Sequence, residues 1–154
     1  MKSSLICSVT IDLDDGDGEI IVSDKNQTLI ISIGLAAITL RNFFSDLNAL
    51  YTYKKTKFKL EHYGSADYYL FVRDSDVIRV EEVRKPGGRD IYKFNLMDFL
   101  FSFEQGFQRF FTKLKKDGVL PLDDGMDDFM YPVNKDITDS FNSFSKNGTV
   151  NNFV

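Results

Sequence analysis

The chain has little of the residue types from which most cross-links and metal sites are built. Its 154 residues include one cysteine, Cys7, one histidine, His62, and no tryptophan. A single cysteine excludes an internal disulfide and fits a reducing compartment. The sequence also lacks the cluster of cysteine and histidine ligands that marks a zinc site. We therefore expect a protein without disulfides and without a bound metal.

Catalytic signatures are missing as well. The sequence contains no Gly-x-Ser-x-Gly, no Walker loop and no Gly-x-Gly-x-x-Gly. A catalytic histidine needs an oriented carboxylate or nucleophile beside it, whereas the strand period places His62 on the core side of a strand or at a sheet edge. We expect a structural histidine, no catalytic residues and no cofactor, so the protein is not expected to be an enzyme.

Long apolar runs are also absent. The longest stretch, Leu29 to Leu40, includes Ser32 and Thr39 and is too short to span a bilayer. The apolar run near the N-terminus is too short for a signal peptide. The sequence therefore predicts a cytoplasmic protein that does not enter a membrane.

Aromatic residues are abundant, with fifteen Phe and seven Tyr. Many of them fall in the stretch 94–116, where apolar residues recur at steps of four and three, which is the spacing of one helix face. Asn95 is a good N-cap, Asp98 lies in the first turn, and Gly118 ends the helix. The residues of this apolar face are Leu96, Phe99, Leu100, Phe103, Phe107, Phe110, Phe111 and Leu114.

The remaining chain alternates between strand and helix patterns. Residues 5–14 show a period of two, with Cys7 on the inward set, and strands 19–23 and 28–34 follow. A helix is expected from Leu40 to Tyr51 with Thr39 as its N-cap. Four short strands come next, at 57–63, 68–72, 77–83 and 89–94.

This order predicts the α+β class. We expect an antiparallel sheet of about six to seven strands with two main helices packed on one face. Residues 1–117 form the α+β domain, and residues 118–154 form an irregular acidic C-terminal tail that packs on it and frays at its end. Within this tail, 136–144 is a short helix with Ile137, Phe141 and Phe144 inward.

Charge is distributed unevenly around a net value of −4. Residues 1–53 carry three basic and seven acidic side chains, residues 54–116 fourteen and nine, and residues 117–154 two and seven. A local excess of one charge is explained equally well by a solvated surface and by a binding face. The lysines from Lys54 to Lys59 suit a helix end and a sheet edge better than a nucleic acid site, so no nucleic acid partner is expected.

The acidic segment from Asp12 to Glu19 raises the question of calcium. An EF-hand loop needs acidic residues at positions one, three and five, Gly at six and Glu at twelve. Counted from Asp12, positions five, six and twelve are Gly16, Asp17 and Ser23. The segment is therefore expected to be a solvated hairpin tip.

Two segments carry a family resemblance: Ile-Thr-Leu-Arg-Asn-Phe-Phe-Ser-Asp-Leu-Asn-Ala-Leu-Tyr (Ile38 to Tyr51) and Arg-Asp-Ile-Tyr-Lys-Phe-Asn-Leu-Met-Asp-Phe-Leu (Arg89 to Leu100). With the strands around them, they resemble WapI-type immunity proteins over about Leu5 to Leu114. These are small bacterial proteins that neutralise the wall-associated contact-dependent toxins of neighbouring cells. The resemblance implies a cytoplasmic inhibitor that binds a cognate toxin domain, often a nuclease.

A basic toxin nuclease would be met by an acidic surface, which steers the encounter while buried aromatics set the lifetime. Two other classes stay open. One is a phage or housekeeping protein-interaction module, which the neighbouring gene would distinguish. The other is an enzyme with a small pocket between sheet and helices, in which His62 and a carboxylate would converge. The expected partner-binding residues are Asp123, Asp124, Asp127, Asp128, Tyr131, Asp14, Asp15 and Asp17.

Overall fold

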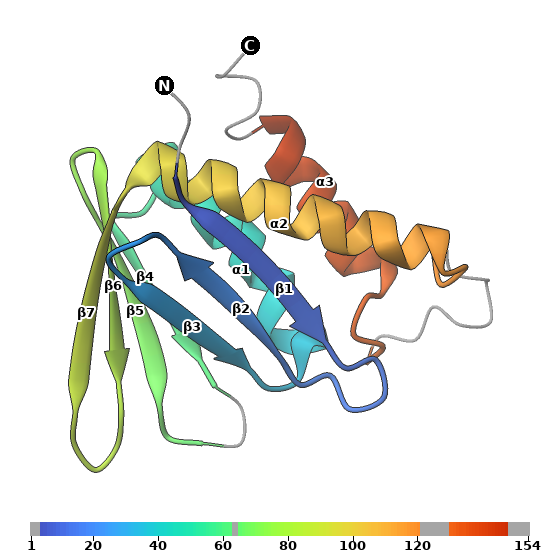
Figure 1. Cartoon of the computed structure of the whole chain (residues 1–154), viewed down its shortest axis with the longest axis horizontal. Helices are drawn as coiled ribbons and strands as arrows, with labels where there is room; N and C mark the ends of the chain where they lie inside the picture. The colour runs from blue at the N-terminus through green and yellow to red at the C-terminus, as the bar shows by residue number, and fades with distance from the viewer. Residues whose placement is uncertain (1–3, 63–64, 121–129, 148–154) are drawn as a thin grey trace.

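The computed structural model describes residues 4–62, 65–120 and 130–147 (Figure 1). The described chain has seven strands and three helices, and the predicted α+β class is confirmed. The strands are β1 (Ile6–Ile11), β2 (Gly18–Ser23), β3 (Thr28–Ile33), β4 (Lys57–Glu61), β5 (Tyr68–Asp74), β6 (Val77–Val83) and β7 (Arg89–Asn95). The helices are α1 (Ala36–Tyr51), α2 (Leu96–Lys116) and α3 (Lys135–Asn147). None of these helices combines the length and apolarity that a membrane span requires.

The strands pair antiparallel, as expected, but they form two sheets where a single sheet was predicted. Sheet A has the order β1-β2-β3 and sheet B the order β4-β5-β6-β7. The single-sheet expectation was wrong because the β3 backbone at Ile30 and Ser32 bonds to the Tyr69 hydroxyl of β5 and not to a neighbouring strand of sheet B. Figure 1 shows the two sheets splayed apart, with the helices lying along one side of sheet A.

Both sheets and all three helices contribute to one buried cluster of apolar residues. Phenylalanine rings join the elements across it. Phe43 of α1 lies 5.5 Å from Phe71 of β5 and 5.4 Å from Phe103 of α2, measured between ring centroids. Phe44 lies 4.8 Å from Phe107. The aromatic core predicted from composition is therefore what holds the sheets and helices together.

Helix α2 follows the sequence-based prediction closely. The Asn95 side chain accepts a hydrogen bond from the Asp98 amide at 3.0 Å, which confirms the N-cap. The predicted apolar face is buried, apart from a half-buried Phe110. Gly106 lies against β1, where an added Cβ would meet the Cys7 sulfur at 2.8 Å. The glycine is thus explained by a close crossing of helix and sheet.

Helix α1 begins earlier than predicted. Its N-cap is Leu35, in the left-handed region at φ 52°, and helical residues start at Ala36. Thr39, expected as the cap, lies inside the first turn and donates its hydroxyl to the carbonyl oxygens of Gly34 and Leu35. The prediction was wrong because the left-handed Leu35, and not a capping side chain, begins the helix, after which Ala36 and Ala37 favour helical structure.

The predicted helix in the C-terminal extension is confirmed as α3, which packs against α1. Ile137, Phe141 and Phe144 are buried, as expected from their spacing. The Phe141 ring lies 5.4 Å from Phe44. The described part of the extension therefore contributes to the same core as residues 1–117.

Side chains from other elements bond to the backbone of three of the four terminal strands. Arg109 of α2 donates to the Cys7 carbonyl on β1 at 2.7 Å. The Tyr69 hydroxyl bonds to the backbone of β3. Gln27 donates its side-chain amide to the Lys93 carbonyl on β7 at 2.7 Å. Such contacts occupy backbone groups that an additional strand could otherwise use.

Candidate functional site

The turn between β1 and β2 is an ordered acidic loop. The Asp12 amide donates to the Asp17 carbonyl at 2.8 Å, and the Gly16 amide donates to the Asp12 carbonyl at 2.8 Å. The carboxylates of Asp12 and Asp15 accept the amides of Asp14 and Asp17. Such side-chain caps stabilise a tight turn locally, and Gly16 supplies a positive φ of 79°.

Two distant segments hold this turn in place. The Ala36 amide at the start of α1 donates to the Gly16 carbonyl at 2.9 Å. Gly16 is buried, and a Cβ built on it would lie 3.6 Å from Pro132 Cγ. The acidic turn and the residues just before α3 are therefore neighbours, as Figure 1 shows at the end of the β1–β2 hairpin.

The fold brings together part of the predicted acidic surface. Asp14, Asp15 and Asp17 are exposed on the one turn. Tyr131, next to Pro132, is half-buried against the core near that turn. The predicted residues that lie outside the described ranges are Asp123, Asp124, Asp127 and Asp128.

The turn is a surface of negative charge. Its four aspartates, Asp12, Asp14, Asp15 and Asp17, are exposed, and within the described ranges no lysine or arginine forms a salt bridge with them. Across the same ranges, no group of three or more His, Cys, Asp or Glu side chains could hold a metal ion. The turn therefore carries four exposed carboxylates without a described ion-pair partner.

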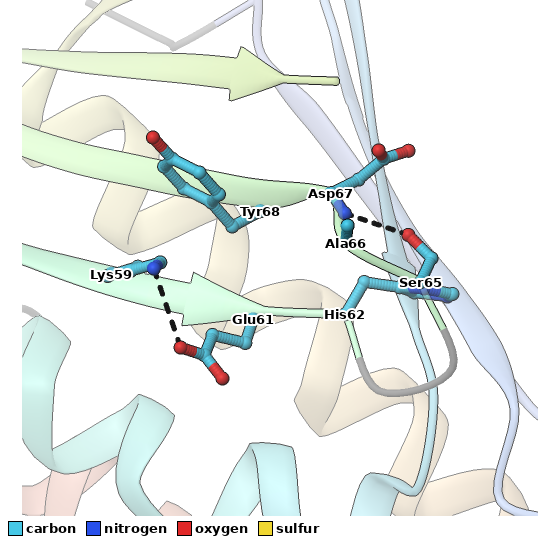
Figure 2. A pocket seen from close by; sticks show the side chains of 7 residues that line it. All are labelled: Lys59, Glu61, His62, Ser65, Ala66, Asp67 and Tyr68. Atoms are coloured by element: carbon cyan, nitrogen blue, oxygen red, sulfur yellow. Dashed lines mark hydrogen bonds and ion pairs between the residues drawn. The ribbon is translucent and has the colours of Figure 1, made fainter. Parts of the chain in front are cut away.

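His62 lies just beyond the end of β4, half-buried, at the edge of sheet B. It lines a shallow hollow of about 300 Å³ together with Lys59, Glu61 and residues 65–68. Figure 2 shows that the side chains of His62 and Glu61 leave the strand in different directions, with Glu61 pointing toward Lys59. The Glu61 carboxylate lies 3.5 Å from the Lys59 ammonium.

Asp67, the second carboxylate of the hollow, bonds to a backbone amide outside it. Asp67 Oδ1 accepts the backbone amide of Lys85 at 3.0 Å. Among the described residues, no hydrogen bond joins the His62 ring to a carboxylate, and Ser65 accepts from the Asp67 amide. Within the described residues, the two carboxylates of this hollow therefore bond to Lys59 and to the Lys85 amide, not to the His62 ring.

A charge cluster on the outer face of sheet B was not anticipated. Glu81 of β6 is only 6% exposed, and its carboxylate accepts hydrogen bonds from Arg79 at 2.8 Å and Arg89 at 3.0 Å. The alternation of β6 places Arg79 and Glu81 on one face, but the approach of Arg89 depends on the register of β7. The cluster lies on the face of β6 opposite the buried Ile78 and Val80.

Comparisons of this chain with protein-family models, with curated proteins and with solved structures found no match.

Proposed function

We propose that the chain is a non-catalytic cytoplasmic protein that binds another protein and blocks it by occlusion. The most specific form of this proposal is an immunity protein that inhibits a basic toxin domain, such as a nuclease. The observation that supports it is the β1–β2 turn, where Asp14 and Asp17 are exposed on a loop that is bonded to the start of α1 and lies next to Pro132.

An ordered acidic loop suits this role for two physical reasons. Charges that are already positioned lose little conformational freedom when a partner binds. Exposed charges also steer a partner of opposite sign during diffusion, which raises the association rate more than it changes the lifetime of the complex. The half-buried Tyr131 beside the turn would add an aromatic contact at the margin of the interface.

The partner can be sought by affinity purification of the tagged protein from its native host. A toxin gene directly upstream would point to the same partner. The toxin domain should then lose its activity when it is mixed with this protein. When produced in cells that lack this protein, the toxin domain should stop their growth. If the partner has no toxic activity, the immunity role is contradicted and the protein is a binding module for that partner.

The acidic turn is tested by the rate of association with that partner. The double variant Asp14→Asn/Asp17→Asn removes two charges and leaves the capping carboxylates of Asp12 and Asp15 intact. The matched control is Asp74→Asn/Asp76→Asn, two exposed aspartates at the β5–β6 turn. We expect the first variant to associate roughly tenfold more slowly at low salt, with the difference shrinking as salt screens the charges. Equal rates for both variants would contradict the role of this turn.

A further inference from the structure

The outer edge of β4 presents backbone groups that no strand of sheet B uses. The Arg73 amide donates to the Thr56 carbonyl, and the His62 amide donates to the Asp67 carbonyl. In an antiparallel pair, hydrogen-bonded residues alternate with residues whose backbone groups point away from the partner strand. The register with β5 therefore turns the amides and carbonyls of Lys57, Lys59 and Glu61 outward.

This edge differs from the other three. The terminal strands β1, β3 and β7 each receive a side-chain hydrogen bond on their backbone from another element. In the described ranges, no such bond reaches the outward backbone groups of Lys57, Lys59 or Glu61. Of the four terminal strands, β4 is thus the one whose outward backbone groups receive no described hydrogen bond from a side chain.

A groove runs beside this edge. It has a volume of about 200 Å³, with residues of β4 on one side and the half-exposed face of α1 on the other. Ile38, Asn42 and Asp46 supply the helix wall. In Figure 2, β4 is the strand of the sheet next to α1, and the Glu61 side chain points away from β5. An extended segment lying on β4 would therefore have a helix beneath it.

We propose that an extended segment of a partner protein adds to sheet B along β4 as a fifth strand. The main-chain hydrogen bonds of such strand addition provide affinity, and the flanking side chains select the sequence. This inference goes beyond the proposed function and does not depend on the acidic turn or on the nature of the toxin.

The side chains of β4 define the chemistry of the added strand. Lys57 and Lys59 stand on the outer face, so residues placed opposite them are best acidic. Phe58 and Leu60 face inward, so the intervening residues are apolar and extend that face toward Ile38. The strand that fits alternates polar and apolar residues, with acidic residues opposite Lys57 and Lys59 and no acidic residue opposite Glu61, which lies on the same face.

The side chains of this edge also bear on a second copy of this chain as the occupant. A symmetric pairing of two β4 strands centred on Lys57 would set the two Lys57 side chains directly opposite each other, and like charges in that position destabilise a sheet. A pairing centred on Lys59 would oppose the two Lys59 side chains but would also set each Lys57 opposite Glu61 of the other copy, so this register is the one that sedimentation must exclude. Edge lysines are a common means by which proteins prevent their own sheets from pairing. The lysines therefore oppose self-association in the Lys57-centred register, and they attract an acidic strand.

The test uses end-capped synthetic octapeptides and the full chain. One peptide alternates polar residues and valine, with glutamate at the two central polar positions and threonine at the outer two, and its control has lysine in place of the two glutamates. Binding is followed by the amide shifts and hydrogen exchange of the protein. We expect the glutamate peptide to slow exchange at the amides of Lys57, Lys59 and Glu61, and the lysine peptide to bind at least roughly tenfold more weakly. Equal binding of both peptides, or protection elsewhere, would overturn the proposal.

Two methylated peptides sharpen the test without altering the protein. Residues opposite Lys57 and Lys59 form the hydrogen-bonded pairs, so the glutamate amides point at β4 and the valine amides point away. N-methylation of two glutamates should weaken binding at least roughly tenfold, whereas methylation of two valines should leave it nearly unchanged. Equal losses from the two peptides would exclude strand addition in this register.

A protein variant provides the reciprocal measurement. Lys59→Pro removes one outward amide at an edge position, where proline is tolerated, and should abolish binding. Lys59→Ala keeps the amide and should only reduce binding and its salt dependence. Asp14→Asn/Asp17→Asn should bind the peptide as the unaltered protein does. If sedimentation instead shows the protein to be a dimer that Lys59→Pro dissociates, the occupant is a second copy and the proposal fails.

Discussion

The Ser32 amide on β3 donates a hydrogen bond of 2.9 Å to the hydroxyl of Tyr69 on β5. The same hydroxyl donates to the Ile30 carbonyl at 3.2 Å. A side chain of sheet B thus occupies backbone groups on the terminal strand of sheet A. This contact joins the sheets where strand pairing does not.

The first prediction concerns this contact. Tyr69→Phe keeps the ring but removes both hydrogen bonds, and it should lower the free energy of unfolding by about 1–2 kcal/mol. Tyr92→Phe is the matched control, because Tyr92 is half-buried and has no described hydroxyl bond. Urea unfolding of the two variants measures the difference. Equal stabilities would mean that the hydroxyl of Tyr69 does not hold the sheets together.

The second prediction concerns Gly106. Alanine there would gain about 1 kcal/mol in helix propensity, but its Cβ would lie 2.8 Å from the Cys7 sulfur and 2.9 Å from the Cys7 carbonyl oxygen. Overpacking of this kind costs about 1–3 kcal/mol, so we expect Gly106→Ala to be less stable than the unaltered protein. Gly87→Ala, where an added Cβ has no atom within 4 Å, should stay within about 0.5 kcal/mol. A stabilised Gly106→Ala would contradict the close crossing.

The third prediction concerns the reactivity of Cys7. The side chain is 1% exposed, and burial raises the pKa of the thiol to about 12, an increase that the nearby Arg109 charge partly offsets. Because the thiolate is the nucleophile, a thiol reagent should react slowly at about pH 8. The reaction should become fast in denaturant. Rapid labelling of the folded protein would show that β1 opens locally.

The fourth prediction concerns pH. Glu104 on α2 is buried, and burial raises the pKa of its carboxyl, while hydrogen bonds from Ser145 and Gln105 partly lower it. A raised pKa in the folded state means that folding favours the protonated form. The stabilising contribution is complete below the ordinary pKa of a glutamate and is lost as pH rises through the raised value.

Glu104→Gln is neutral at every pH, so it tests this dependence directly. The free energy of unfolding of the unaltered protein minus that of the variant should fall as pH rises above the ordinary range of a glutamate. A difference that does not change with pH would contradict the raised pKa of Glu104.

The sequence predicted most elements because their signals are local. The apolar spacing of α2, the Asn95 cap and the inward position of Cys7 follow from consecutive residues and the period of helix or strand. The start of α1 was misplaced because a left-handed Leu35 is not visible in residue type. For the candidate site, the exposed aspartates of the β1–β2 turn could be read directly from composition and turn residues.

The strand partners could not be predicted in the same way. Tyr69 and Ser32 are far apart in sequence, and nothing near either residue shows that a hydroxyl, rather than a strand, will meet β3. The neighbourhood of Gly16 and Pro132 is equally non-local. Likewise, Lys57 and Lys59 indicate an edge strand, but the open side of β4 exists only because β5 takes its other side.

The sequence by itself therefore determined which segments form helices and strands, which side of each is apolar, and where the acidic β1–β2 turn is exposed. The tertiary structure alone decided that the strands divide into two sheets and that β4 keeps a free edge. The physical reason is that side-chain periodicity belongs to consecutive residues. The backbone groups of a strand edge are satisfied or left open by whichever distant element packs beside them.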